Sequence, residues 1–222
     1  MANRPVFIPI FDKEQLFKEI DIEFKWNPGF AVIQKQKNIK ALHENAKNEN
    51  IFPLLEVSTK SSELLGQRLS AFNLKIETED FGNISIESAF QGSKVFKNNL
   101  QYTDIYQKES LEAKKDKRLK ESGNLSNFNY FGNEWELEPK SAFYDWLYIS
   151  ALYPHKEYLK NNLCKYKGFT DIEFNPKKSF SCQARTCAII VSLIELDLLD
   201  KAMLSQKNFI KIIYEKSTLW DF

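Results

Sequence analysis

The stretch ISIESAFQGSKVFK, residues Ile84–Lys97, is the part of the sequence from which the fold and a candidate site can be predicted. Ile84 and Ile86 alternate with Ser85, which is typical of a strand. We expect the chain to continue as a helix, on which residues three, four and seven apart share a face. One stripe of this helix would then carry Glu87, Phe90, Gln91 and Lys94.

This stripe combines a carboxylate, an aromatic ring, an amide and an amine. A buried acid or a buried amine costs free energy unless its charge is paired. Perturbed groups of this kind gather at active sites. The spacing leaves two interpretations open: a polar wall of an active site built on Glu87 and Lys94, or a structural ion pair between them on a surface helix.

Two segments of the chain resemble the core motif of the NADAR family (NAD- and ADP-ribose-associated, YbiA-like). Leu69-Ser70-Ala71-Phe72 stands where the family has Phe-Ser-Asn-Phe, and Ile86–Lys94 stands where it has Val-Glu-His-Tyr-Phe-Gln-Ala-x-Lys. The chain departs from that pattern at Ala71, which replaces an asparagine although Asn73 is near, and at Ser88-Ala89, which replaces His-Tyr. With its opening RPVFIPI, the whole chain more closely resembles the NADAR proteins encoded beside DarT-type DNA ADP-ribosyltransferase toxins.

The resemblance implies a hydrolase, an ADP-ribosyl glycohydrolase that removes ADP-ribose from guanine bases of DNA. Such an enzyme would repair DNA as the antitoxin to a DarT-type toxin, with ADP-ribosylated DNA as its substrate and ADP-ribose as its product. It would need no cofactor and no metal. Two alternatives stay open: a small-molecule N-glycosidase acting on riboflavin-pathway-like intermediates, and a non-enzymatic antitoxin that binds ADP-ribose or its toxin directly.

The catalytic residues implied by the resemblance are Glu87 and Lys94. Hydrolysis of a base–ribose bond needs charge stabilisation at the anomeric carbon and a proton for the leaving nitrogen, and Glu87 is the best-placed acid. For Lys94 we weigh three roles. It could be a neutral amine that forms a Schiff base with the opened ribose, a cation that holds a phosphate or hydroxyl, or a structural lysine.

Further residues are expected to bind the substrate. Phe72 and Phe90 would flank the cleft and Phe72 would stack on a base, unless both rings are part of the core. Hydrogen bonds to the ribose or base are expected from Ser70, Asn73 and Gln91.

In the family, a strand of the type Leu-Val-Glu is followed by a Trp-Gly that lines the pocket. Phe169–Phe174, FTDIEF, is expected to be that strand, and Glu173 matches its glutamate. The Trp-Gly is absent, and Gln183 and Arg185 are the candidate substitutes. Arg185 suits a pyrophosphate or else pairs with a carboxylate. Lys35, in a polar run of a predicted helix, either faces solvent or reaches a phosphate.

The predicted fold class is α+β: a mainly helical single domain with a small β-sheet, of the YbiA-like NADAR type. It would span residues 1–222, with 1–50 as an N-terminal extension packed on a core of 51–200. Pro9 predicts that the first strand is short or lies at a sheet edge. The expected strands are Val6–Ile10, Ile20–Trp26 and Leu54–Val57, with a hairpin of Leu74–Thr78 and Ile84–Ile86. The expected helices include Ala31–Lys47 and Pro139–Tyr153.

Charge is nearly balanced over the 222 residues, with a formal net charge of +1. This excludes a globally basic nucleic-acid coat but not a local patch. The most basic segment is either a solvated helix or a contact to a nucleic-acid backbone. It carries Lys108, Lys114, Lys115, Lys117, Arg118 and Lys120.

The three cysteines form no Cys-x-x-Cys pair, and only two histidines are present, which argues against a zinc centre. The cysteines are expected to be reduced, in a cytoplasmic protein. The opening apolar run is too short for a signal peptide. The longest apolar run, Ala188–Leu199, is interrupted by Glu195 and Asp197, so it indicates a buried helix and no membrane partner.

Overall fold

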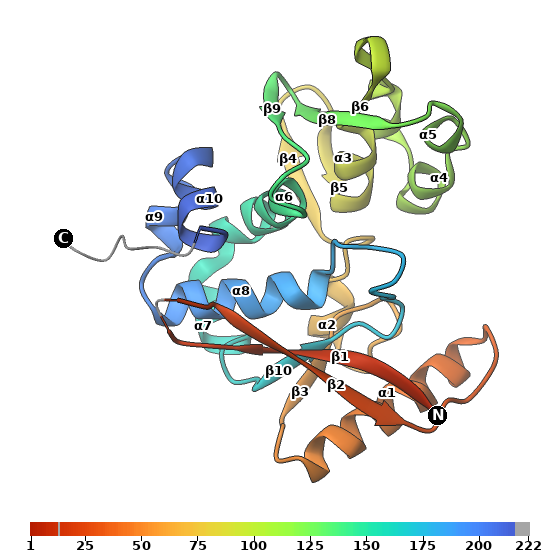
Figure 1. The fold of residues 1–222 in the computed structure, drawn as a ribbon, viewed down its shortest axis with the longest axis vertical. Coiled ribbons are helices and arrows are strands. Elements are labelled where there is room, and N and C mark those ends of the chain that lie inside the picture. The colour runs from red at the N-terminus through yellow and green to blue at the C-terminus, as the bar shows by residue number, and fades with distance from the viewer. Residues whose placement is uncertain (13, 216–222) are drawn as a thin grey trace. The chain divides into compact units, whose positions relative to one another are not determined.

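The computed structural model describes residues 1–12 and 14–215, which form two compact units (Figure 1). The terminal unit combines Met1–Ser70 with the chain from Leu152 onward, and the middle unit is Ala71–Ala151. Both contain helices and small sheets, and more of the chain is helical than extended, so the predicted α+β class is confirmed. That residues 1–222 act as one domain stays a prediction.

The terminal unit contains a four-stranded sheet with the order β2-β1-β10-β3. β1 is antiparallel to both of its neighbours, whereas β10 and β3 are parallel. The strands are β1 (Ala2–Pro9), β2 (Phe17–Phe24), β3 (Leu54–Glu56) and β10 (Gly168–Thr170).

The prediction that Pro9 places the first strand at a sheet edge is wrong, because β1 lies between β2 and β10. A proline cannot donate a ladder hydrogen bond, so it is excluded from paired positions that need one. β10 has three residues and its register with β1 is centred on Phe7 and Phe169. Pro5 and Pro9 lie outside this short pairing and need not donate to β10.

Helices pack on both faces of this sheet. α1 (Val32–Asn48) packs on one face, where Ile39 and Leu42 meet Val6 of β1 and Ile22 of β2. α8 (Gln183–Glu195) lies on the opposite face, on which Phe7, Phe169 and Leu55 are in register across three strands (Figure 1). The shorter helices of the unit are α2 (Leu64–Arg68), η3 (Tyr153–His155), α7 (Lys156–Asn162), α9 (Leu199–Met203) and α10 (Gln206–Ile213). Within residues 1–12 and 14–215, no helix is both long and apolar enough to cross a membrane.

The middle unit begins with the predicted hairpin, whose strands are β4 (Lys75–Thr78) and β5 (Gly82–Ser85). β5 runs directly into α3 (Ile86–Gly92), so the predicted change from strand to helix is confirmed. The Ser85 hydroxyl caps the helix by accepting a hydrogen bond of 3.0 Å from the Ser88 backbone N–H. The hairpin therefore fixes where α3 starts.

A second sheet follows, with four antiparallel strands in the order β7-β6-β8-β9. Its strands are β6 (Lys94–Phe96), β7 (Leu100–Gln101), β8 (Leu125–Tyr130) and β9 (Asn133–Trp135). The helices around it are η1 (Lys97–Asn99), η2 (Thr103–Gln107), α4 (Ser110–Lys115), α5 (Arg118–Glu121) and α6 (Ala142–Leu152), whose last residue belongs to the terminal unit.

The prediction that Lys94 lies on the same helix as Glu87 is wrong. α3 ends at Gly92, and Lys94 is the first residue of β6, opposite Phe128 of β8. The Tyr106 ring lies against the helix end, so that a Cβ on Gly92 would come within 2.5 Å of the ring atom Cδ1. The Ser93 carbonyl accepts a hydrogen bond of 2.7 Å from the Asn129 N–H. These contacts direct the chain into the sheet after about two turns of helix.

Candidate active site

The candidate active site of the middle unit starts from Glu87 in the first turn of α3. Its side chain is 7% exposed, and its Oε1 accepts a hydrogen bond of 2.9 Å from Nε2 of Gln91. Carboxylates are favoured near the amino-terminal end of a helix, where backbone N–H groups point outward. The buried acid thus has a fixed orientation and a partner one turn along the helix.

The amide of Gln91 has a further property. Because Nε2 donates to Glu87, the orientation of the amide is set, and its Oε1 is buried with no hydrogen-bond partner among the described residues. Buried acceptors in native proteins are almost always satisfied, by protein, water or ligand. This oxygen is therefore a place where an N–H or O–H group of a ligand can donate.

Lys94 lies near this pair despite its position on β6. Its Nζ is 5.2 Å from the ring centroid of Phe90. Burial lowers the pKa of Lys94, the negative charge of Glu87 raises it, and the positive charge of Lys114 lowers it again. Among the described residues no ion pair joins Lys94 to Glu87, so both groups are free to interact with a ligand.

The two predicted aromatic residues have different surroundings. Phe90 packs against Phe128 at 5.3 Å, Phe143 at 6.0 Å and Tyr144 at 5.3 Å between ring centroids. These contacts place it in the aromatic core behind α3, which was the alternative interpretation. Phe72 is half-buried, and Nζ of Lys114 lies 4.9 Å from its ring centroid. Both rings are half-buried and each has a lysine over it, but Phe90 also packs against three other aromatic rings.

The remaining predicted residues of the first motif fall on either side of the boundary between the units. Asn73 is exposed and belongs to the middle unit. Ser70 is the last residue of the first segment of the terminal unit, and is 1% exposed.

The expected strand Phe169–Phe174 is shorter than predicted, because β10 ends at Thr170. Asp171 turns the chain out of the sheet: its Oδ1 accepts from the N–H of Glu173 at 2.9 Å. Its carbonyl oxygen accepts from the N–H of Phe174 at 3.1 Å. This side-chain turn explains why the alternation of FTDIEF does not continue as a strand.

Glu173 and Lys35 are brought together by the structure, but as a pair with each other. Nζ of Lys35 lies 2.9 Å from Oε1 of Glu173, and also 5.6 Å from the ring of Trp26. The Glu173 side chain is 47% exposed. The Lys35 side chain is only 17% exposed, so this ion pair is partly buried and Lys35 is engaged by Glu173 and Trp26.

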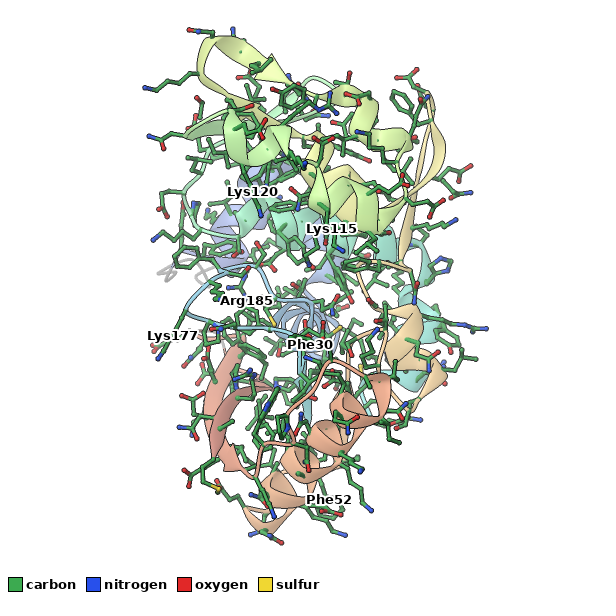
Figure 2. All side chains as sticks on the ribbon, turned by 90° about the vertical axis from the view of Figure 1, so that its right-hand side faces the viewer. Phe30, Phe52, Lys115, Lys120, Lys177 and Arg185 are labelled. Atoms are coloured by element: carbon green, nitrogen blue, oxygen red, sulfur yellow. The ribbon has the colours of Figure 1, made fainter. Side chains whose placement is uncertain are left out.

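Gln183 and Arg185 lie at the start of α8. Nε2 of Gln183 donates to the carbonyl of Val57 and, at 3.0 Å, to Oδ2 of Asp171. Nη1 of Arg185 donates to the carbonyl of Phe180 at 3.2 Å (Figure 2 labels Arg185). Gln183 therefore connects the start of α8 to the residues that directly follow β3 and β10.

The sequence did not lead us to a buried hydrogen-bond network in the terminal unit. Oε2 of Glu56, which is 2% exposed, accepts from the Thr170 hydroxyl at 2.6 Å, and its Oε1 accepts from the Ile172 N–H at 2.9 Å. Nε2 of His43 lies 2.8 Å from the same Thr170 oxygen. The Thr170 hydroxyl is thus shared by Glu56 and His43, and which atom donates to His43 or accepts from it depends on the histidine tautomer. This network extends from α1 to the carboxyl end of β3.

The sequence contained one indication of this hydrogen-bond network. Glu56 is the one charged residue in the apolar strand Leu54–Val57, and Asp171 follows the last strand. The carboxyl ends of parallel neighbouring strands meet at the same edge of a sheet. Burial raises the pKa of Glu56 to about 8, with the negative charge of Asp171 adding to the rise, and burial lowers the pKa of His43 to about 4.

These shifts predict how stability depends on pH. The pKa of Glu56 rises from 4.5 to about 8 on folding. The folded state therefore binds more protons than the unfolded state in this range, and stability falls as pH rises across it. His43 has the opposite effect between pH 4 and its ordinary value of 6.5. The free energy of unfolding should therefore decrease between about pH 6.5 and 8, by no more than about 1.4 kcal/mol per pH unit.

Glu56→Gln removes this titration while keeping the shape of the side chain. Urea unfolding of the variant should give a stability that is flatter from pH 6.5 to 8 than that of the parent. Glu173→Gln, which alters an exposed carboxylate of the same unit, should keep the parental slope. An unchanged slope in Glu56→Gln would show that Glu56 is already ionised in the folded protein.

Comparison with known proteins places the chain in a family. A search of curated proteins finds no match. The family model described as DarT1-associated NADAR antitoxin matches residues 2–219. This match covers nearly the whole sequence and agrees with the motif around Glu87. The chain therefore belongs to the family of DarT1-associated NADAR antitoxins.

Proposed function

We propose that this antitoxin is an ADP-ribosyl glycohydrolase that removes ADP-ribose from guanine bases of DNA, and so reverses the modification made by a DarT1-type toxin. The observation that carries the proposal is the pair formed by Glu87 and Lys94 in the middle unit. Glu87 is a buried carboxylate oriented by Gln91, and Lys94 is a partly desolvated amine beside it. Membership of the antitoxin family supports the same role.

In the proposed reaction the bond between the anomeric carbon and the guanine nitrogen breaks, and its electron pair leaves with the base. Positive charge then develops at the anomeric carbon, where the Glu87 carboxylate stabilises it. The protonated form of Lys94 gives its proton to the leaving nitrogen. Water adds to the anomeric carbon and gives a proton to the now neutral Lys94, which restores its cation. Free ADP-ribose and repaired guanine are the products.

Other residues are proposed to hold the substrate. The unpartnered Oε1 of Gln91 accepts a hydrogen bond from a ribose hydroxyl. Phe72 stacks on a base, whereas Phe90 supports Lys94 from the aromatic core. Asn73, an exposed residue of the same unit, is proposed to contact the sugar or base. The roles expected from sequence for Ser70, Glu173, Gln183, Arg185 and Lys35, which belong to the terminal unit, stay predictions.

The basic segment is divided by its ion pairs. Nη2 of Arg118 lies 2.7 Å from both Asp116 and Asp104, and Nζ of Lys108 lies 2.6 Å from Asp116. Hydrogen bonds from these two cations hold the pKa of Asp116 well below its usual range. Arg118 and Lys108 are thus committed to an internal network and are poor candidates for binding phosphate.

The other lysines of this segment are exposed and have no ion pair among the described residues: Lys114, Lys115, Lys117 and Lys120 (Figure 2 labels two of them). Lys114 connects them to the candidate active site, because it lies over Phe72 and lowers the pKa of Lys94. α4, which carries Lys114 and Lys115, packs against α3. We therefore propose that these four lysines bind the phosphates of the DNA backbone.

The first test concerns Glu87. Glu87→Gln keeps the hydrogen-bonding shape but removes the charge, so turnover of a defined oligonucleotide carrying ADP-ribosylguanine should fall roughly a hundredfold or more. Glu77→Gln, at an exposed position of the same unit, should keep normal turnover. Near-normal turnover by a folded Glu87→Gln protein would reject the role of Glu87. Substrate binding without turnover in the parent protein would instead identify a non-enzymatic antitoxin.

The second test separates a covalent from a proton-donating role of Lys94. The pKa of Lys94 is lowered, because burial outweighs the attraction of Glu87. We propose the proton-donating cation rather than a nucleophilic amine, since a lowered pKa makes an ammonium a stronger acid. Borohydride added during turnover should therefore leave no adduct on Lys94, as read by mass spectrometry of the digested protein. Lys94→Arg should lose turnover as Lys94→Met does, because a guanidinium does not give up its proton. A trapped adduct on Lys94 would establish the Schiff-base route instead.

The third test concerns the basic segment. Lys114→Glu/Lys115→Glu should weaken binding of the modified oligonucleotide and reduce the slope of log affinity against log salt by about 0.7 to 0.9 for each phosphate that the protein no longer neutralises. Affinity for free ADP-ribose should change much less. Lys75→Glu/Lys97→Glu reverses the same charge at two exposed lysines elsewhere in the unit and should have a smaller effect. Equal effects of the two pairs would show that the segment is only a solvated surface.

A further inference from the structure

The terminal unit contains a pocket that neither the family match nor the proposed reaction uses. It has a volume of about 510 Å³ and lies along α1, next to β3 and the segment that follows it. Its wall includes Lys40, His43 and Lys47 of α1, with Phe52 and Lys60. Sites for small molecules commonly have volumes of a few hundred to a thousand Å³ and combine apolar surface with a few polar groups.

The pocket has an excess of positive charge. Three lysines line it, and Glu44 is the one carboxylate. Lys40 and Glu44 are 3.8 Å apart with side chains 78% and 63% exposed, so their mutual attraction is weak. Lys47 and Lys60 have no ion pair among the described residues, and Nζ of Lys60 donates to the Thr59 hydroxyl at 3.0 Å. Such a wall favours an anion.

An aromatic ring stands beside these cations. Phe52 is 52% exposed, and Nζ of Lys47 lies 5.3 Å from its ring centroid. Figure 2 shows Phe52 at the end of α1 that is far from Phe30. A ring kept in contact with water offers a face on which a planar group can stack.

His43 supplies the polar group of the wall. Its Nε2 is hydrogen-bonded to the Thr170 hydroxyl, and burial lowers its pKa to about 4, so the ring is neutral at physiological pH. A neutral ring has one donor and one acceptor nitrogen, so Nδ1 accepts from a ligand in one tautomer and donates to it in the other. It makes no hydrogen bond within the described part of the chain, and His43 lines the pocket.

We propose that this pocket binds a nucleotide, with its phosphate held by Lys47 and Lys60 and its base stacked on Phe52. A polar group of the base or a sugar hydroxyl makes a hydrogen bond with Nδ1 of His43. The nucleotide can be free or can be part of a single DNA strand, since both present the same phosphate, sugar and base. The proposal concerns binding of unmodified nucleotide and does not depend on the chemistry of Glu87.

The experiment measures binding of two unmodified probes to the full chain: dAMP by calorimetry, and a fluorescein-labelled single-stranded hexanucleotide by anisotropy at low salt. Lys47→Ala/Lys60→Ala should weaken binding roughly tenfold or more, and Phe52→Leu roughly fivefold or more. The matched controls are Lys37→Ala, on the exposed part of the same helix, and Phe30→Leu, at the 99% exposed ring beyond its other end. Both controls should bind like the parent.

The two probes distinguish the sources of the ligand. Pocket-dependent binding of dAMP identifies a free-nucleotide site, and pocket-dependent binding of the hexanucleotide alone identifies a strand-binding site. The hexanucleotide measurement is repeated in a Lys114→Glu/Lys115→Glu background, so that the basic segment of the middle unit does not contribute. No measurable binding of either probe, or equal losses in the pocket and control variants, would overturn the proposal. Loss of turnover in Glu87→Gln bears on the proposed function only, because these probes contain no ADP-ribose.

Discussion

Keeping the carboxylate of Glu87 out of water imposes several features on the middle unit. A buried charge needs compensation, and here it comes from the amino-terminal end of α3 and from the amide of Gln91. Both depend on α3 starting at Ile86, which the Ser85 cap and the β4–β5 hairpin ensure. The Glu87 N–H also donates to the carbonyl of Ala71 at 3.0 Å, so the main chain is held as well as the side chain. A change at the hairpin would thus reach the carboxylate through its backbone.

The local part of this arrangement could be predicted from sequence. Alternation of Ile84 and Ile86, followed by helical spacing of Glu87 and Gln91, led to the observed change from strand to helix. The position of Lys94 could not be predicted in the same way. Its spacing of seven from Glu87 suits a helix, but the helix ends where the Tyr106 ring approaches Gly92. Tyr106 belongs to η2, so the residue pattern within α3 does not show where the helix ends.

The terminal unit shows the same limit more strongly. Glu56 and Thr170 share a hydrogen bond although they are 114 residues apart in the sequence. A lone acid in an apolar strand indicated that a partner must exist, but not which residue it is. The interpretation of FTDIEF as a continuous strand failed for a local reason, since the Asp171 side chain bonds to the backbone two residues later. Short polar side chains can thus end a strand that alternation would extend.

The central place of β10 in the terminal sheet has a consequence for how the protein is made. β1 and β3 leave the ribosome early, but the strand that joins them is completed only with Thr170. Until then both have open edges, which are prone to pair with other chains. The middle unit is contiguous in sequence and contains all the partners of its own strands. The nascent chain can therefore assemble the surroundings of Glu87 while the terminal sheet is still open, and that sheet closes only after Thr170 has been made.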